Sequence, residues 1–204
     1  EIFRDVGVDA IVTGGQTMNP STEDILKQIN KIPAETIFVL PNNKNIILAS
    51  QQAAKLTKDK NVIVIGTKSV PEGISAMLNY DDSMTDDEIK ESMEEGMEYI
   101  KTLSVTFAVR DTVLDGKEIH EGDFIGMSGN SIVSVENEVA KCTEDLIKSA
   151  VDDDAEVVTI YYGEDVSKND AEKMKEYVES EFDHCEVELH YGGQPLYYYL
   201  ISVE

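Results

Sequence analysis

Short apolar runs alternate with amphipathic stretches through the first hundred residues of the chain. The apolar runs have the length of buried strands, and the stretches between them repeat apolar residues at helical spacing. The predicted strands are 8–13, 36–40 and 61–66, and the predicted helices are 21–32, 46–56, 72–79 and 85–103. Strands that each lead into a helix indicate a mainly parallel sheet flanked by helices. Residues 1–103 are therefore expected to form an N-terminal α/β sub-domain.

The pattern changes beyond residue 104, where alternating strands and a hairpin turn signal, Leu114-Asp115-Gly116-Lys117, indicate antiparallel pairing. Amphipathic helices and further strands then follow each other to the end of the chain. The predicted strands are 105–110, a short one before Ser128-Gly129-Asn130, 156–162, 185–190 and 196–203, and the predicted helices are 136–150 and 167–182. Residues 104–204 are expected to form a C-terminal α/β sub-domain with a mixed sheet.

Charge narrows the range of partners. The 204-residue chain has a formal net charge of −24, which opposes binding to nucleic acid or to an anionic membrane surface and favours a basic partner. Its apolar runs are too short for membrane insertion. Cys142 and Cys185 show neither disulfide nor zinc spacing, so a reducing cytoplasm is the expected location. The start at Glu1, in what reads as the tail of a helix, suggests a piece of something longer.

Two polar loops follow the first two predicted strands, at the edge where open α/β sheets usually bind ligands. The first loop matches neither a dinucleotide fingerprint nor a phosphate-binding loop, and it contains no lysine. A tight turn before a helix capped by Ser21 and Asp24 explains it equally well. The residues of this possible ligand crevice are Gly14, Gly15, Gln16, Thr17, Asn19, Asn42, Asn43 and Lys44.

A dense acidic run surrounds the helix predicted at 85–103. It lacks the spacing of a calcium loop, so it is either a solvated helix face or a docking surface for a basic partner. The candidate partner-binding residues are Asp81, Asp82, Asp86, Asp87, Glu88, Glu91, Glu94, Glu95 and Glu98.

No residue is assigned a catalytic or metal-binding role. His120, His184 and His190 are too scattered for a metal site by local spacing, and no Ser or Cys lies in a nucleophile motif. These histidines are expected to be surface or partly packed residues.

Three N-terminal motifs and the C-terminal one are specific to a known family. They are Gly-Val-Asp-Ala-Ile-Val-Thr-Gly-Gly-Gln-Thr-Met-Asn-Pro-Ser-Thr (7–22), Val-Leu-Pro-Asn-Asn-Lys-Asn (39–45), Ser-Val-Pro-Glu-Gly-Ile-Ser-Ala-Met-Leu (69–78) and Gly-Gly-Gln-Pro-Leu-Tyr-Tyr-Tyr-Leu-Ile-Ser-Val-Glu (192–204). With them the chain resembles, over essentially its whole length, the C-terminal region of the bacterial fatty acid kinase catalytic subunit.

The resemblance implies a DegV-like fold of two α/β sub-domains that docks a fatty-acid-binding carrier protein and performs no chemistry itself. It also implies that ATP and magnesium bind an N-terminal domain outside this chain, in a kinase whose other domains make acyl phosphate for phospholipid synthesis. No cofactor and no catalytic residue carry over to this chain. Two hypotheses remain: a docking module that uses the acidic run, or a regulatory small-molecule or fatty-acid sensor with a crevice near Gln16 and Asn43.

Overall fold

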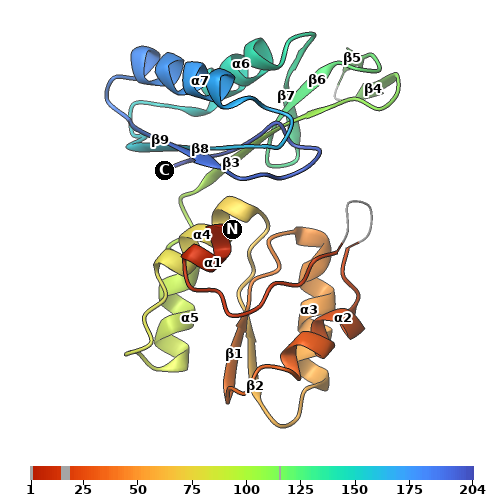
Figure 1. Ribbon diagram of the computed structural model, residues 1–204, viewed down its shortest axis with the longest axis vertical. Helices are drawn as coiled ribbons and strands as arrows, with labels where there is room; N and C mark the ends of the chain where they lie inside the picture. The colour runs from red at the N-terminus through yellow and green to blue at the C-terminus, as the bar shows by residue number, and fades with distance from the viewer. Residues whose placement is uncertain (1, 15–18, 115) are drawn as a thin grey trace. The chain divides into compact units, whose positions relative to one another are not determined.

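The computed structural model describes residues 2–14, 19–114 and 116–204 (Figure 1). The chain divides into two compact units, Glu1–Tyr99 and Ile100–Glu204, called unit 1 and unit 2 below. The boundary lies four residues before the one expected from the sequence. No helix in the described parts of the chain is long and apolar enough to cross a membrane.

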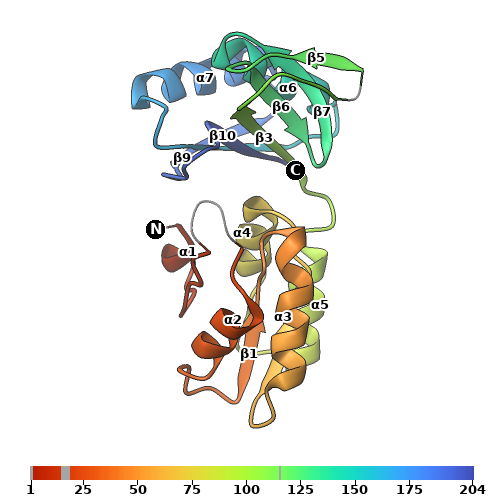
Figure 2. The same ribbon diagram turned by 90° about the vertical axis from the view of Figure 1, so that its right-hand side faces the viewer.

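Unit 1 is built on two parallel strands between two pairs of helices (Figures 1 and 2). Its elements are α1 (Ile2–Asp5), α2 (Thr22–Ile29), β1 (Thr36–Val39), α3 (Lys44–Leu56), β2 (Asn61–Val64), α4 (Val70–Leu78) and α5 (Asp86–Glu95). Successive side chains of a strand point to opposite faces. Ile37 of β1 accordingly packs with α2 and α3, whereas Phe38 packs with α4 and α5. Both faces of this small sheet are therefore covered.

The apolar run at 8–13, predicted as a third strand, is not one. Residues 8–14 are irregular in the structure, and the described part of unit 1 contains only β1 and β2 as strands. Val12 packs against the cluster formed by α2, β1 and α3 without pairing to β1. The run is thus apolar because it covers this cluster.

The helix predicted at 85–103 is also too long. α5 ends at Glu95 with Gly96 as its C-cap, and the chain enters a strand at Lys101. Gly96 is held against α4, where Ser75 Oγ donates a hydrogen bond of 2.6 Å to Gly96 O. A Cβ at Gly96 would lie 2.2 Å from Asn79 Nδ2, so this close approach requires glycine.

The predicted helix start at Ser21 is confirmed. Asp24 N donates to Ser21 Oγ at 3.2 Å, and Ser21 N donates to Asp24 Oδ2 at 3.0 Å, which forms a complete capping box. The hydrogen bond from the Ser21 side chain lowers the pKa of Asp24 below its ordinary value. Pro71 occupies the first turn of α4, as predicted, after the N-cap Ser69.

Unit 2 contains a mixed six-stranded sheet in the order β7-β6-β3-β10-β8-β9, with helices α6 and α7 covering one face (Figure 1). β8 and β9 pair in parallel and the other neighbours are antiparallel. The elements are β3 (Lys101–Phe107), β4 (Thr112–Leu114), β5 (Lys117–Ile119), β6 (Phe124–Ser128), β7 (Ser131–Glu136), α6 (Val139–Ala150), β8 (Val157–Tyr162), α7 (Lys168–Glu181), β9 (Glu186–Tyr191) and β10 (Tyr199–Val203). The mixed sheet is as predicted, but β7 was missed.

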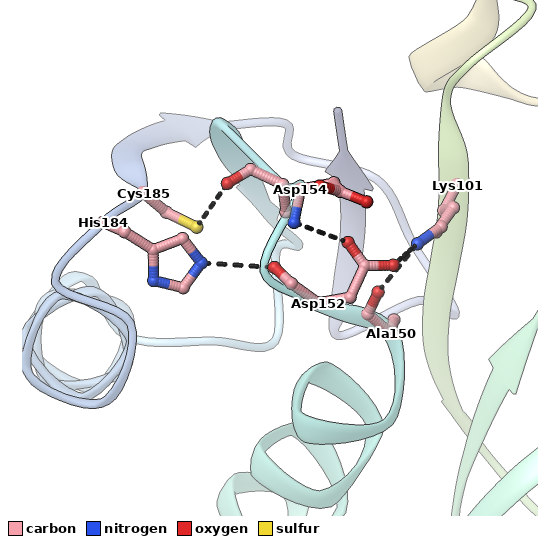
Figure 3. A network of polar contacts seen from close by, with 7 residues as sticks. Lys101, Ala150, Asp152, Asp154, His184 and Cys185 are labelled. Carbon is pink, nitrogen blue, oxygen red and sulfur yellow. Dashed lines mark hydrogen bonds and ion pairs between the residues drawn. The ribbon is translucent and has the colours of Figure 1, made fainter.

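A polar network joins the start of β3 to the ends of two other elements (Figure 3). Lys101 Nζ donates to Ala150 O at 3.2 Å, at the C-terminus of α6, and pairs with Asp152 Oδ2 at 2.5 Å. A cation is favourable at a helix C-terminus. His184 Nε2 lies 3.2 Å from Asp152 O, just before β9. This histidine therefore takes part in a structural contact at the surface of unit 2.

The loop between β9 and β10 explains part of the C-terminal motif. Gly192 N and Gly193 N both donate to Tyr162 O, at 3.0 and 3.2 Å, and Gln194 Nε2 donates to Tyr161 O at 3.0 Å. The loop is thereby fixed to the end of β8. The first three residues of the motif Gly192-Gly193-Gln194-Pro195 thus have a structural role.

Candidate functional site

The acidic run, residues 81–98, centres on α5. Ile89 and Met93 face the core of unit 1 and are buried. Asp87, Glu91 and Glu95 repeat every four residues, so they lie together on the face of α5 that is turned to solvent. Within the described parts of the chain, no ion pair or hydrogen bond of their carboxylates is found. We call these three residues the carboxylate stripe.

Other members of the run serve the fold. Asp86 Oδ2 accepts hydrogen bonds from Thr36 Oγ1 at 2.8 Å and from Asn61 Nδ2 at 2.9 Å. Thr36 and Asn61 are the paired first residues of β1 and β2. Asp86 thus fastens the N-terminus of α5 to the small sheet, and a docking role for its carboxylate has no support.

Two further carboxylates stabilise local backbone. Glu88 completes a capping box with Thr85, whose backbone N–H bond to the carboxylate lowers the pKa of Glu88. Asp81 Oδ1 accepts from Ser83 N at 2.9 Å, and its hydrogen bonds with Ser83 lower its pKa. The remaining candidates are Asp82 and Glu98, which are exposed, and Glu94, whose Oε2 lies 3.8 Å from Lys90 Nζ.

Replacing Asp86 with alanine is expected to lower the free energy of unfolding by about 1–2 kcal/mol, because two polar side chains lose their acceptor. Asp87→Ala is the matched control. Both aspartates lie in the first turn of α5 and interact similarly with the helix dipole, so the difference isolates the two hydrogen bonds. Urea denaturation measures both variants, and equal losses would contradict a structural role for Asp86.

Apolar side chains are exposed beside the acidic run. Leu78, Tyr80 and Met84, at the end of α4 and in the turn before α5, are 71%, 41% and 42% exposed. Tyrosine and methionine are enriched in protein interfaces. The segment from Leu78 to Glu95 thus combines exposed apolar groups with the carboxylate stripe on neighbouring positions of unit 1.

The predicted crevice corresponds to a cavity of about 440 Å³ inside unit 1. Gly14, Asn19, Asn42 and Asn43 line it, as the sequence suggested. Lys44 is instead the first residue of α3, and Gly15, Gln16 and Thr17 lie outside the described residues. Sequence analysis missed Ser50, which lines the cavity from the second turn of α3, because a lone serine within a helix carries no signal.

The two asparagines after β1 have different local roles. Asn43 caps α3, with its Oδ1 accepting from Asn45 N at 2.9 Å. Asn42 has a φ of 56°, in the left-handed region that asparagine tolerates, and its backbone N–H donates to Thr67 Oγ1 at 2.9 Å. Its carboxamide packs on Gly73 of α4, where a Cβ would lie 2.1 Å from Asn42 Oδ1.

The titratable groups outside these two areas are dispersed. No group of three or more His, Cys, Asp or Glu side chains in the described residues is placed to hold a metal ion. Burial raises the pKa of the Cys142 thiol, which contacts Ser134 Oγ at 3.2 Å in the core of unit 2. Cys185 Sγ donates to Ala155 O at 3.2 Å (Figure 3).

The fold defines a DegV-like α/β protein. The structure of the DegV family protein Cg2579 from Corynebacterium glutamicum superposes with a TM-score of 0.67 at 12% identity, over 99% of this chain and 91% of that one. The fatty acid kinase B3 protein from Streptococcus pneumoniae, solved loaded with linoleic acid, gives a TM-score of 0.58 at 13% identity, over 91% and 76%. At such identities the likeness shows the fold.

The family is shown by sequence. The model of the FakA-like C-terminal family, which is a family of fatty acid kinase subunits, matches residues 1–204, and the chain belongs to this family. Protein YloV from Bacillus subtilis is 40% identical over 204 residues, which are 100% of this chain and 37% of YloV. The chain thus spans little more than a third of the length of the curated relatives it matches.

Proposed function

We propose that this chain is the docking domain of a fatty acid kinase, and that it binds a fatty-acid-binding carrier protein through the carboxylate stripe. The carrier presents the acyl chain, and other domains of the same kinase, with ATP and magnesium, convert the fatty acid to acyl phosphate. In this proposal the chain itself has no catalytic role. Its free thiols, Cys142 and Cys185, support a cytoplasmic setting.

The observation that carries the proposal is the separation of the acidic run into carboxylates that serve the fold and carboxylates that do not. Asp86 and Glu88 hold α5 in place, whereas the stripe presents three negative charges to solvent on one helix face. A net charge of −24 adds long-range attraction for a basic surface. The exposed Tyr80 and Met84 offer apolar contact area close by in the chain.

Support for the partner comes from the family and from the structural neighbours. The chain belongs to a family of fatty acid kinase subunits, and a kinase B3 protein loaded with linoleic acid shares its fold. A fatty-acid-loaded carrier protein of the kinase is therefore the partner to test.

Binding of this carrier to the chain is expected to weaken by about tenfold or more between 50 and 500 mM NaCl, because salt screens charge attraction across a surface. Sedimentation or calorimetry measures the dissociation constant at each salt concentration. Binding that is independent of salt would contradict docking through the stripe, and absence of binding at both concentrations would overturn the proposal.

A further inference from the structure

The cavity in unit 1 has apolar walls and no charged lining residue. Isoleucine side chains from α2, β1 and α3 form much of its surface, among them Ile25, Ile37 and Ile46. None of its described lining residues is Asp, Glu, Lys, Arg or His. Its volume of about 440 Å³ falls within the range of roughly 300–1,000 Å³ typical of small-molecule sites.

Two polar atoms of the lining are buried without a hydrogen-bond partner. Ser50 is fully buried, and its Oγ has no partner among the described residues. Asn42 Oδ1 is likewise buried and unpartnered within the described parts of the chain. Leaving a buried polar group unpaired costs about 1–3 kcal/mol, so such groups in a folded protein call for an explanation. A ligand that supplies hydrogen bonds provides one.

The positions of these two residues set the form of the ligand. Asn42 follows β1, at the N-terminal end of α3, whereas Ser50 lies seven residues beyond the N-cap Asn43, roughly 10 Å along the helix axis. Ser50 and Ile46 are four residues apart and share one face of α3. Polar contacts are therefore available at two depths, with an apolar wall between them.

The lining also decides the charge of the ligand. A buried carboxylate without a cation costs several kcal/mol, and no described lining residue supplies a cation. A buried ammonium group meets the same difficulty, because none of these residues supplies a carboxylate. The matching chemistry is an uncharged polar head on an aliphatic body.

We propose that the cavity in unit 1 binds an uncharged amphiphile, with a hydroxyl or amide head and a medium-length aliphatic body, through hydrogen bonds to Asn42 and Ser50. The inference goes beyond docking and does not depend on it, because it rests on contacts inside unit 1 alone. It differs from a fatty-acid site of the kind considered from the sequence, since an ionised fatty acid finds no countercharge among the described lining residues.

The test compares 1-decanol with decanoate at pH 8, titrated into the 204-residue chain and followed by amide NMR shifts. Decanol is expected to bind, with shifts concentrated at α2, α3 and residues 37–43. Decanoate, ionised at this pH, is expected to bind at least about tenfold more weakly. Equal binding of the two compounds, or no shift with decanol, would overturn the proposal; the latter outcome means that water alone fills the cavity.

Ser50→Ala provides the residue-level test. It removes one hydrogen bond to the head, so the dissociation constant for decanol is expected to rise about fivefold. Without ligand the same variant is expected to have a raised melting temperature, since an unpaired buried hydroxyl is removed. Ser50→Leu fills the space and is expected to abolish the decanol shifts.

Ser75→Ala is the matched control, because Ser75 is also buried in unit 1 but its Oγ donates to Gly96 O at 2.6 Å. Ser75 does not line the cavity. This variant is expected to have a lowered melting temperature and an unchanged affinity for decanol. An unchanged decanol affinity in Ser50→Ala would overturn the assignment, whether or not Ser50→Leu folds.

Discussion

Changing Asp87, Glu91 and Glu95 together to lysine is expected to weaken binding of the fatty-acid-loaded carrier by about 10- to 100-fold at low salt. Individual surface ion pairs contribute little, so reversal of the whole stripe is the informative change. The three side chains are on the solvent face of α5, away from the buried Ile89 and Met93. The variant is therefore expected to fold. Calorimetry at 50 mM and 500 mM NaCl measures the loss, which high salt should reduce.

A matched reversal in unit 2 controls for net charge. Glu172, Glu176 and Glu179 are exposed on α7, and changing them to lysine shifts the net charge from −24 to −18, as reversal of the stripe does. This control is expected to retain most of the carrier affinity. If both variants lose affinity equally, overall charge and not the stripe governs binding.

Asp86 is left out of this reversal for a structural reason. The sequence makes it equivalent to Asp87, but its carboxylate holds Thr36 and Asn61. A lysine at this position would disturb the attachment of α5 to the sheet, and a loss of binding would then report misfolding. Circular dichroism of each variant before titration separates the two effects.

Gly163→Ala is expected to destabilise unit 2 by about 3 kcal/mol or more, through overpacking against backbone. Gly163 follows β8, and its N–H donates to Tyr198 O at 2.8 Å. A Cβ at this position would lie 2.2 Å from Tyr197 O and 2.7 Å from Gln194 O. These carbonyls belong to the segment that fixes the start of β10, so they cannot move without disturbing the central sheet.

Amide hydrogen exchange of β8 and β10 measures this loss, because it reports on unit 2 even if the two units unfold separately. Gly66→Ala is the control. A Cβ at Gly66 meets nothing within 4 Å, so the substitution is expected to change stability by less than about 1 kcal/mol. Wild-type protection of β8 and β10 in Gly163→Ala would show that the loop yields at little cost.

Local patterns identified several parts of this protein correctly. The capping box at Ser21 and Asp24 joins groups three residues apart, and Pro71 acts within its own helix turn. The strands and helices after residue 156 also follow the predicted order. Such features depend on neighbours within three or four positions, which the sequence displays directly.

Where a strand or helix stops depends on partners that are distant in sequence. The apolar residues 8–13 have the composition of a strand, yet a strand exists only where another one pairs with it, and β1 pairs with β2 alone among the described strands. The helix predicted through residue 103 ends at Glu95 because Gly96 meets Asn79 and Ser75. Neither contact can be read from periodicity.

The sequence by itself determined the α/β class, the family and the acidic run on one helix. Only the tertiary structure separated Asp86 from Asp87, since the partners of Asp86 lie 50 and 25 residues away. It also placed Ser50 in an apolar cavity with Asn42, where two uncharged side chains lack partners among the described residues. Chain pattern specifies which residues are apolar or charged, whereas hydrogen-bond satisfaction is a property of three-dimensional packing.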